Sequence, residues 1–169
     1  MFRVEFVGTA NIPIKPYIVA SNHLSLIDPF LYFALKKKDI QKIFGMRFIV
    51  AAAHYDKWYV RTLLGPVGAI RGQKIVWSYE SFFAEAAGVL AGGEPLTIYV
   101  EGGRNSKGSR TVKPGIGYIS SASSCPVLPM KISRKNGISY RVVFGKPYAS
   151  TDSDFSRAAQ RVYRIIEKL

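Results

Sequence analysis

A histidine and an aspartate five residues apart, His23 and Asp28, are well suited to proton transfer. A neutral imidazole can take a proton from an alcohol near neutral pH, and a carboxylate on its other ring nitrogen fixes the tautomer and stabilises the imidazolium. The pair therefore predicts a general base with its orienting partner. The structural alternative is that Asp28 caps a helix and His23 makes loop hydrogen bonds. For this spacing alone that alternative is favoured, although a carboxylate with two oxygens could fill both roles.

A second polar group follows the apolar run at 96–100, where Glu101 precedes Gly102, Gly103 and Arg104. Glycines let backbone amides approach an anion, and an arginine can bind a phosphate through two parallel hydrogen bonds. A glutamate can accept a hydrogen bond from a hydroxyl or from the guanidinium. The segment predicts binding of a phosphate and a neighbouring hydroxyl, the alternative being an ordinary glycine turn with a solvated arginine.

Three further cations are candidates for the same site. Arg71 directly follows a short apolar run at 67–70, and Lys113 precedes a Pro-Gly pair. Lys57 could donate to a developing oxyanion, as could Lys113 to an oxyanion or a phosphate, although a surface lysine is the simpler interpretation of Lys57.

Apolar runs and turn residues indicate the elements that must position these side chains. The Asp28-Pro29 pair predicts a helix start with Asp28 at the N-cap, and Lys36 to Lys38 are expected at that helix's end. The other expected helices are residues 56–64, 76–90 and 154–169, and the expected strands are residues 2–7, 17–20, 47–53, 67–70, 96–100, 127–132 and 140–144.

Alternating strands and helices predict an α/β fold, with residues 1–169 forming a single domain built on a mixed, mostly parallel sheet flanked by helices. Ligands of such sheets gather at the carboxyl ends of the strands. We therefore expect His23, Arg71 and Glu101 to lie along one rim of the sheet.

Composition limits the partners and the location. Twenty-four Lys and Arg residues against 11 Asp and Glu give a formal net charge of +13, which predicts an anionic partner. The longest apolar runs are too short to span a bilayer, and the first residues lack the apolar stretch of a secretory signal. The sequence thus predicts a cytoplasmic protein. Its two His and one Cys form no metal-ligand cluster, and Cys125 reads as a small buried residue rather than a nucleophile.

The motifs together resemble the glycerolipid acyltransferase family, which includes lysophosphatidate and glycerol-3-phosphate acyltransferases. Residues 22–28, Asn-His-Leu-Ser-Leu-Ile-Asp, resemble its Asn-His-(x)4-Asp motif, and residues 65–71, Gly-Pro-Val-Gly-Ala-Ile-Arg, its second motif. Residues 99–104, Tyr-Val-Glu-Gly-Gly-Arg, are similar to its Phe-Pro-Glu-Gly-(Thr or Ser)-Arg motif, with valine and glycine in place of proline and Thr or Ser. Residues 127–130 correspond to the fourth.

The resemblance implies an enzyme in which His23 is the base and Asp28 its partner, while Arg71, Glu101, Gly102 and Arg104 bind the acceptor. The acceptor would be a lysophospholipid or glycerol-3-phosphate, and the donor acyl-CoA or an acyl-carrier protein, with no bound cofactor or metal. Because the long apolar N-terminal helices of many members are not found in the sequence, it also implies peripheral attachment to the anionic inner face of the membrane.

Other classes of function stay open at this point. The charge excess and ten tyrosines suit a basic nucleic-acid-binding module, although the scattered Lys and Arg form no basic stripe and the motifs argue for no nucleic acid. A catalytically silent membrane-surface or partner-binding relative is a second alternative, against which the intact His23 and Asp28 argue. A thioester hydrolase or a transacylase with the same pair is a third.

Overall fold

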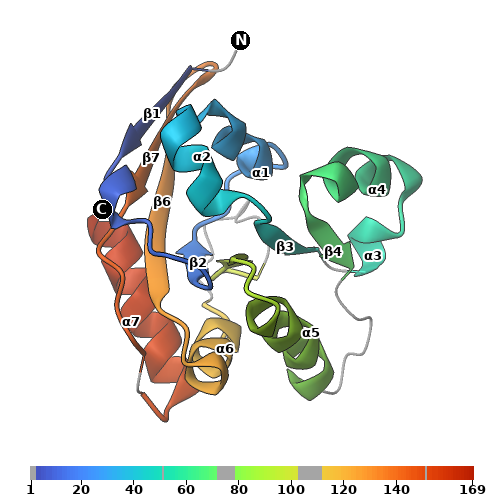
Figure 1. The fold of residues 1–169 in the computed structure, drawn as a ribbon, viewed down its shortest axis with the longest axis vertical. Helices are drawn as coiled ribbons and strands as arrows, with labels where there is room; N and C mark the ends of the chain where they lie inside the picture. Colours follow the sequence, from blue (N-terminus) through green and yellow to red (C-terminus); the bar gives the residue numbers. More distant parts are fainter. Residues whose placement is uncertain (1–2, 51, 72–78, 103–111, 151) are drawn as a thin grey trace.

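A seven-stranded sheet organises the chain, and the computed structural model describes it over residues 3–50, 52–71, 79–102, 112–150 and 152–169 (Figure 1). Its order is β1-β7-β6-β2-β5-β3-β4, and only the β6–β7 pair is antiparallel. This confirms the expected mixed, mostly parallel α/β sheet. The strands are β1 (Arg3–Val7), β2 (Ile18–Ser21), β3 (Arg47–Val50), β4 (Ala69–Arg71), β5 (Leu96–Tyr99), β6 (Val127–Asn136) and β7 (Ser139–Phe144).

The central strand β2 is buried on both faces. Val19 packs with Tyr17 into one apolar cluster, whereas Ile18 and Ala20 pack into another on the opposite face. A strand covered on both sides reads as a continuous apolar run, which is why the sequence marks it clearly. The strand ends at Ser21, so the following loop emerges at the carboxyl edge of the parallel strands.

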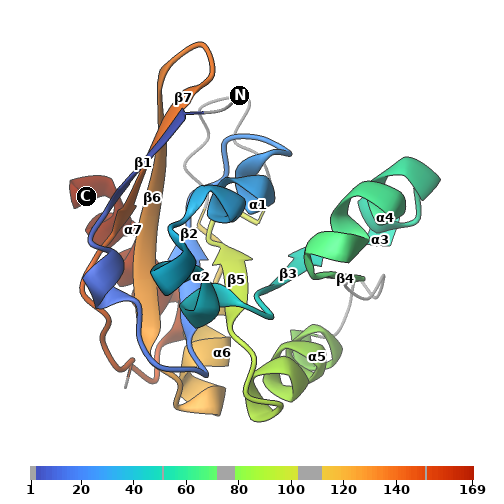
Figure 2. The ribbon, with the colours of Figure 1, turned by 45° about the horizontal axis from the view of Figure 1, so that its top comes forward.

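Helices cover the two faces of the sheet in separate layers. The cluster on one face includes residues of α1 (Asp28–Leu31) and α2 (Lys37–Ile43). The cluster on the other includes residues of α5 (Tyr79–Ala91), α6 (Gly115–Ser123) and α7 (Phe155–Lys168). The short helices α3 (Ala52–Tyr55) and α4 (Trp58–Leu64) stand apart from both layers, beside the β3–β4 edge (Figures 1 and 2). A small third cluster lies beneath them.

Several expected boundaries are wrong. The helix predicted from Asp28 to the three lysines is broken: α1 is short, a 3-10 turn covers Tyr32–Ala34, and Leu35 is extended and buried. Lys36 to Lys38 therefore lie at the start of α2 rather than at a helix end. The strand expected at 47–53 ends at Val50 because α3 follows it, and the 3-10 turn Gly65–Val67 takes the start of the strand expected at 67–70. Phe2 and residues 76–78 lie outside the described residues.

The helix α6 is absent from the sequence-based expectation, because its Gly-Ser-rich sequence has weak helix propensity. Packing decides its structure instead. A Cβ atom on Gly117 would lie 2.2 Å from the carbonyl oxygen of Phe155, at the start of α7. Glycine at this position thus permits the close approach of the two helices.

Candidate active site

The loop that carries the predicted base is anchored where β2 ends. The Asn22 side chain donates from Nδ2 to the Ile132 carbonyl at 2.8 Å and accepts from the Ile132 amide at 2.7 Å. These two bonds continue the pairing of β2 with β6 beyond the last strand residue. They fix the position from which His23 begins.

Asp28 is fully buried and organises the loop before it. Its Oδ2 accepts hydrogen bonds from His23 Nδ1 at 2.7 Å, from the Leu24 amide at 2.8 Å and from the Ser25 amide at 3.0 Å. Its Oδ1 accepts from Ser25 Oγ at 2.9 Å. The expected N-cap role is wrong, because Ile27 occupies that position and the Asp28 carboxylate turns back to the loop's own donors.

His23 is held on two sides. Because Asp28 accepts at Nδ1, that nitrogen carries the proton and Nε2 keeps its lone pair. The imidazole also stacks on the ring of Tyr99, with ring centroids 4.0 Å apart and planes 16° from parallel. Its side chain is 14% exposed, so a substrate can reach it. The arrangement can remove a proton from an alcohol.

The segment after β5 lies against the same loop. Glu101 Oε2 accepts from the His23 amide at 3.2 Å, and the Lys113 amide donates to the Val100 carbonyl at 2.9 Å. Gly102 adopts a left-handed conformation, and a Cβ atom there would lie 2.7 Å from Lys113 Cγ. Glu101, Gly102 and Lys113 are therefore gathered near His23. The predicted Arg104 lies outside the described residues.

Arg71 lies at the same carboxyl edge, at the end of the outermost strand, β4. Its guanidinium donates to both carboxylate oxygens of Asp56, at 2.6 and 2.9 Å, and this contact raises the pKa of Arg71. The Arg71 guanidinium, which was predicted to bind a phosphate, is therefore paired with a carboxylate. The sequence analysis did not single out Asp56, which no local motif connects to Arg71.

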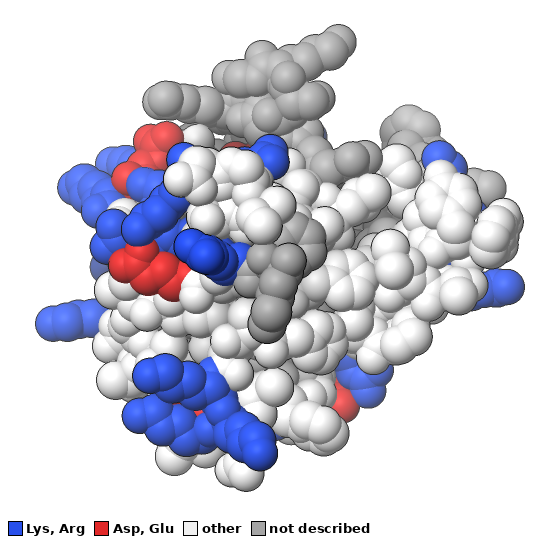
Figure 3. All heavy atoms as spheres, turned by 90° about the horizontal axis from the view of Figure 1, so that it is seen from above, with Lys and Arg blue, Asp and Glu red and all other residues white. Residues whose placement is uncertain are grey.

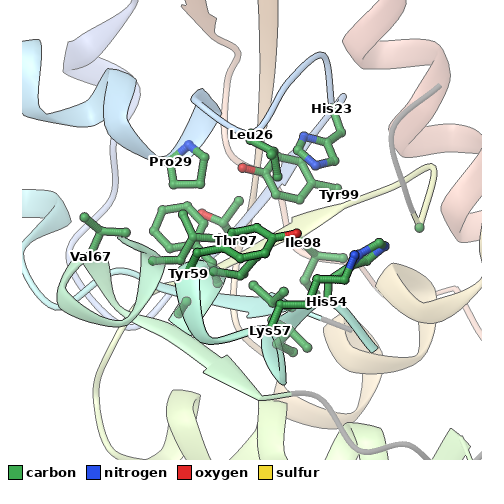
Figure 4. A pocket seen from close by; sticks show the side chains of 17 residues that line it. His23, Leu26, Pro29, His54, Lys57, Tyr59, Val67, Thr97, Ile98 and Tyr99 are labelled. Carbon is green, nitrogen blue, oxygen red and sulfur yellow. The ribbon is translucent and has the colours of Figure 1, made fainter. Parts of the chain in front are cut away.

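An apolar cleft of about 370 Å³ opens beside His23 (Figure 4). The sheet, helix α4 and the 3-10 turn after it supply the apolar walls, which include Phe48, Ile49, Val60, Leu64, Val67 and Ile98. The polar lining includes His54, Lys57 and Tyr59, so the predicted Lys57 does lie in this cleft. The sequence analysis proposed neither His54 nor Tyr59 as a site residue.

Tyr99 is a further residue of the site that the sequence analysis missed. Alternation along β5 could have found it, because Tyr99 shares a strand face with Thr97 and is paired in register with Ser21, two residues before His23. Burial raises the pKa of Tyr99 well above its usual value, so the phenol, which is neutral at pH 7 in any case, stays protonated into the alkaline range. Within the described residues its hydroxyl is buried without a hydrogen-bond partner.

The side chains and helices of the described residues also bear on metal binding and on the membrane. No group of three or more His, Cys, Asp and Glu side chains in this part of the chain is placed to hold a metal ion. No helix within it combines the length and apolar character needed to cross a bilayer. Cys125 is buried in the core.

Comparison with known proteins places this geometry in context. The family model called Acyltransferase matches residues 3–133. No curated protein matches the sequence significantly. The fold is similar to the crystal structure of the 1-acyl-sn-glycerophosphate (LPA) acyltransferase PlsC from Thermotoga maritima, with a TM-score of 0.66 and 20% identity over 99% of this chain and 70% of that one. At this identity the likeness shows a shared fold.

Proposed function

Since the chain belongs to the acyltransferase family, we propose that it moves a fatty acyl group from an acyl thioester to a hydroxyl of a lysophospholipid such as 1-acyl-sn-glycerol-3-phosphate. The observation that carries this proposal is the 2.7 Å contact between His23 Nδ1 and Asp28 Oδ2 beside an apolar cleft that His23 lines. A base beside such a cleft meets both needs of the reaction, proton removal and binding of a fatty chain.

In the proposed reaction His23 Nε2 takes the proton of the acceptor hydroxyl while its oxygen attacks the thioester carbonyl. The tetrahedral intermediate collapses as the carbon–sulfur bond breaks, and the imidazolium returns the proton to the leaving thiolate. Asp28 stabilises the imidazolium between these two steps. The products are the ester and a free thiol, and no acyl-enzyme forms.

The cleft is the proposed binding site of the fatty acyl chain. Its walls are mostly aliphatic and aromatic side chains. Their contact with the acyl chain is favourable, because both apolar surfaces then leave water. Lys57 lies in the lining and is our candidate donor to the oxyanion of the tetrahedral intermediate.

The acceptor phosphate is proposed to bind the basic residues of the carboxyl edge. Lys113 lies beside Gly102 near His23, and Arg71 would have to exchange its contact with Asp56 for the phosphate. Arg104 joins this group on the resemblance of its motif. One carboxylate oxygen of Glu101 accepts a hydrogen bond from the His23 amide, and the other can accept from an acceptor hydroxyl.

Acyl-CoA and acyl-carrier protein are both proposed donors, because each presents the thioester on an anionic carrier that suits the charge of +13. The same charge supports peripheral attachment to the anionic inner face of the membrane. Each basic residue near such a surface contributes roughly 1 kcal/mol.

An assay series tests the proposal. Each donor is offered with 1-acyl-sn-glycerol-3-phosphate, with other lysophospholipids and with glycerol-3-phosphate, and the acylated product is measured by mass spectrometry. The matched control is His23→Ala, which should lose most of the turnover. Release of thiol without acylation of any acceptor would identify a hydrolase and overturn the proposed transfer.

A further inference from the structure

Four large apolar side chains are exposed on two segments that border the cleft, helix α4 and the loop after β2. Trp58, Tyr59 and Leu63 on α4 are 73, 49 and 55% exposed, and Leu26 in the loop after His23 is 46% exposed. We call these four residues the docking face. The rings of Trp58 and Tyr59 lie 6.0 Å apart between centroids, and exposed apolar groups that gather in this way mark interaction surfaces.

Two of these residues also line the cleft, so the docking face and the cleft are continuous. Leu26 and Tyr59 come from different segments, the loop after β2 and helix α4, and both border the same cavity (Figure 4). A ligand that enters from the docking face thus meets an apolar path toward His23, which lines the cavity as well.

We infer that the docking face seats on an anionic lipid bilayer, so that the mouth of the cleft opens into the membrane and receives its lipid substrate there. The lipid substrate in this inference rests on the proposed function, whereas the docking face itself rests on the exposed side chains of the surface. Trp and Tyr favour the boundary between headgroups and acyl chains, because each has an apolar ring and a polar group.

Charge favours a bilayer as the occupant. Lys57 and Arg61 are exposed beside the apolar side chains of α4, which is the composition of helices that lie in a membrane interface. Figure 3 shows the lobe formed by α3 and α4 largely white, with basic side chains at its margin. The overall charge of +13 adds attraction to anionic headgroups.

A second copy of this chain fits the face less well. A stable interface buries roughly 800 Å² on each partner, and the docking face has four large apolar side chains on a seven-residue helix and one loop to supply it. Partial insertion into a bilayer has no such requirement, since each side chain that leaves water contributes by itself.

Flotation with vesicles tests the inference. Vesicles of phosphatidylcholine and phosphatidylglycerol are mixed with the full chain at low and at high ionic strength. Wild type should bind at low salt and keep part of its binding at high salt, because apolar insertion is not screened. The Trp58→Ala/Leu63→Ala double variant should bind at least about tenfold more weakly, with the largest deficit at high salt.

Phe44→Ala is the matched control. Phe44 is 77% exposed, and its carbonyl accepts a hydrogen bond from Lys15, which lies before β2. It therefore exposes an aromatic ring at the amino ends of the strands, opposite the cleft. Its removal should leave vesicle binding unchanged, and an equal loss for both variants would overturn the assigned face.

Quenching by brominated lipid supplies a second measurement that does not depend on weakened binding. The chain has two tryptophans, and Trp58→Phe keeps an apolar ring while it removes one fluorophore. We expect quenching in wild type and its loss in Trp58→Phe, which should still bind. Unchanged quenching would show that Trp58 stays outside the bilayer and would overturn the inference.

Other outcomes separate this inference from the proposed function. If the Trp58→Ala/Leu63→Ala variant turns a wild-type dimer into a monomer and still binds vesicles, the face joins two copies and the membrane assignment is wrong. If vesicle binding depends on Trp58 but no thioester is consumed, the docking face stands and the proposed reaction fails. If the protein acylates short-chain soluble acceptors but binds no vesicles, the proposed reaction stands and the docking face is wrong.

Discussion

The imidazole of His23 lies nearly parallel to the ring of Tyr99, with centroids 4.0 Å apart, and this contact fixes the plane in which the base can act. Asp28 controls one ring nitrogen from the edge, and Tyr99 controls the ring from its face. Tyr99 brings no negative charge to the imidazole, because a phenol is neutral at pH 7 and burial raises its pKa further.

Tyr99→Phe should therefore keep activity, since it retains the stacked ring and removes a hydroxyl that has no partner within the described residues. Its melting temperature should equal or exceed that of wild type, because an unsatisfied buried polar group is costly. Tyr99→Leu should lower kcat by about tenfold or more, since the imidazole loses its support. The pH profile of kcat should be the same for wild type and Tyr99→Phe. A loss as large in Tyr99→Phe as in Tyr99→Leu would assign the effect to the hydroxyl.

His23→Ala should lower turnover by about two to four decades, the usual contribution of a general base. The fold should persist, because the side chain is partly exposed and Asp28 keeps its bonds to the loop amides. Circular dichroism and thermal unfolding check the fold, and product formation checks turnover. Equal activity of the variant and wild type on every donor would remove His23 from the mechanism.

Asp28→Asn should reduce turnover by about two to four decades, because a neutral amide stabilises the imidazolium much less. Its stability should change little. An amide oxygen can take the place of Oδ2, and its NH2 group can donate to Ser25 Oγ, which then reverses its role. Asp28→Ala instead leaves buried donors unsatisfied, at a cost of about 1 to 3 kcal/mol for each. Denaturant titration of the two variants separates the catalytic effect from the structural one.

The residues that carry chemistry were predictable where their types and strand positions are local features. The runs at 17–20 and 96–100 are recognisable as buried strands, and each ends just before a polar segment. Parallel pairing of β2 with β5 then brings His23 and Glu101 to one edge, as expected. Their roles in substrate binding stay predictions, and Arg104 lies outside the described residues.

Long-range contacts set the limit of sequence reasoning. The Asp28-Pro29 pair suits a helix start, but Ile27 occupies the N-cap position, because the His23–Ser25 segment offers four donors to the buried carboxylate. The pairing of Arg71 with Asp56 follows from the packing of α3 and α4 beside β4, which no single segment encodes. Helix α6 depends in the same way on its contact with α7.

Glu85 on α5 should make stability depend on pH. Burial raises its carboxyl pKa, while attraction to Arg71 opposes the shift, and one carboxylate oxygen is buried without a partner in the described part of the chain. The folded state thus holds the proton more tightly, so stability falls as pH rises from the ordinary carboxyl range through the raised value. Glu85→Gln should raise the melting temperature at neutral pH and lose this advantage in acid. A constant difference across the pH series would contradict the assignment.

Two arginines of this structure bind carboxylates in the same bidentate way but at opposite edges of the sheet. Arg71 ends β4 and contacts Asp56 at 2.6 and 2.9 Å, on the carboxyl edge. Arg47 begins β3 and contacts Glu94 at 2.8 and 2.9 Å, on the amino edge. The second pair is therefore a matched control for the first.

Arg71→Lys and Arg104→Lys should raise the Michaelis constant for the acceptor, because a lysine keeps the charge but loses the fork that binds a phosphate through two hydrogen bonds. Each lost charge-assisted bond costs about 1.5 to 3 kcal/mol, or roughly one to two decades in affinity. Asp56→Asn should lower the same constant by removing the competing carboxylate, and Arg47→Lys should change nothing. Steady-state kinetics with each substrate varied in turn supply the test. If the arginine variants raised the donor's constant and spared the acceptor's, these residues would bind the phosphates of the donor instead.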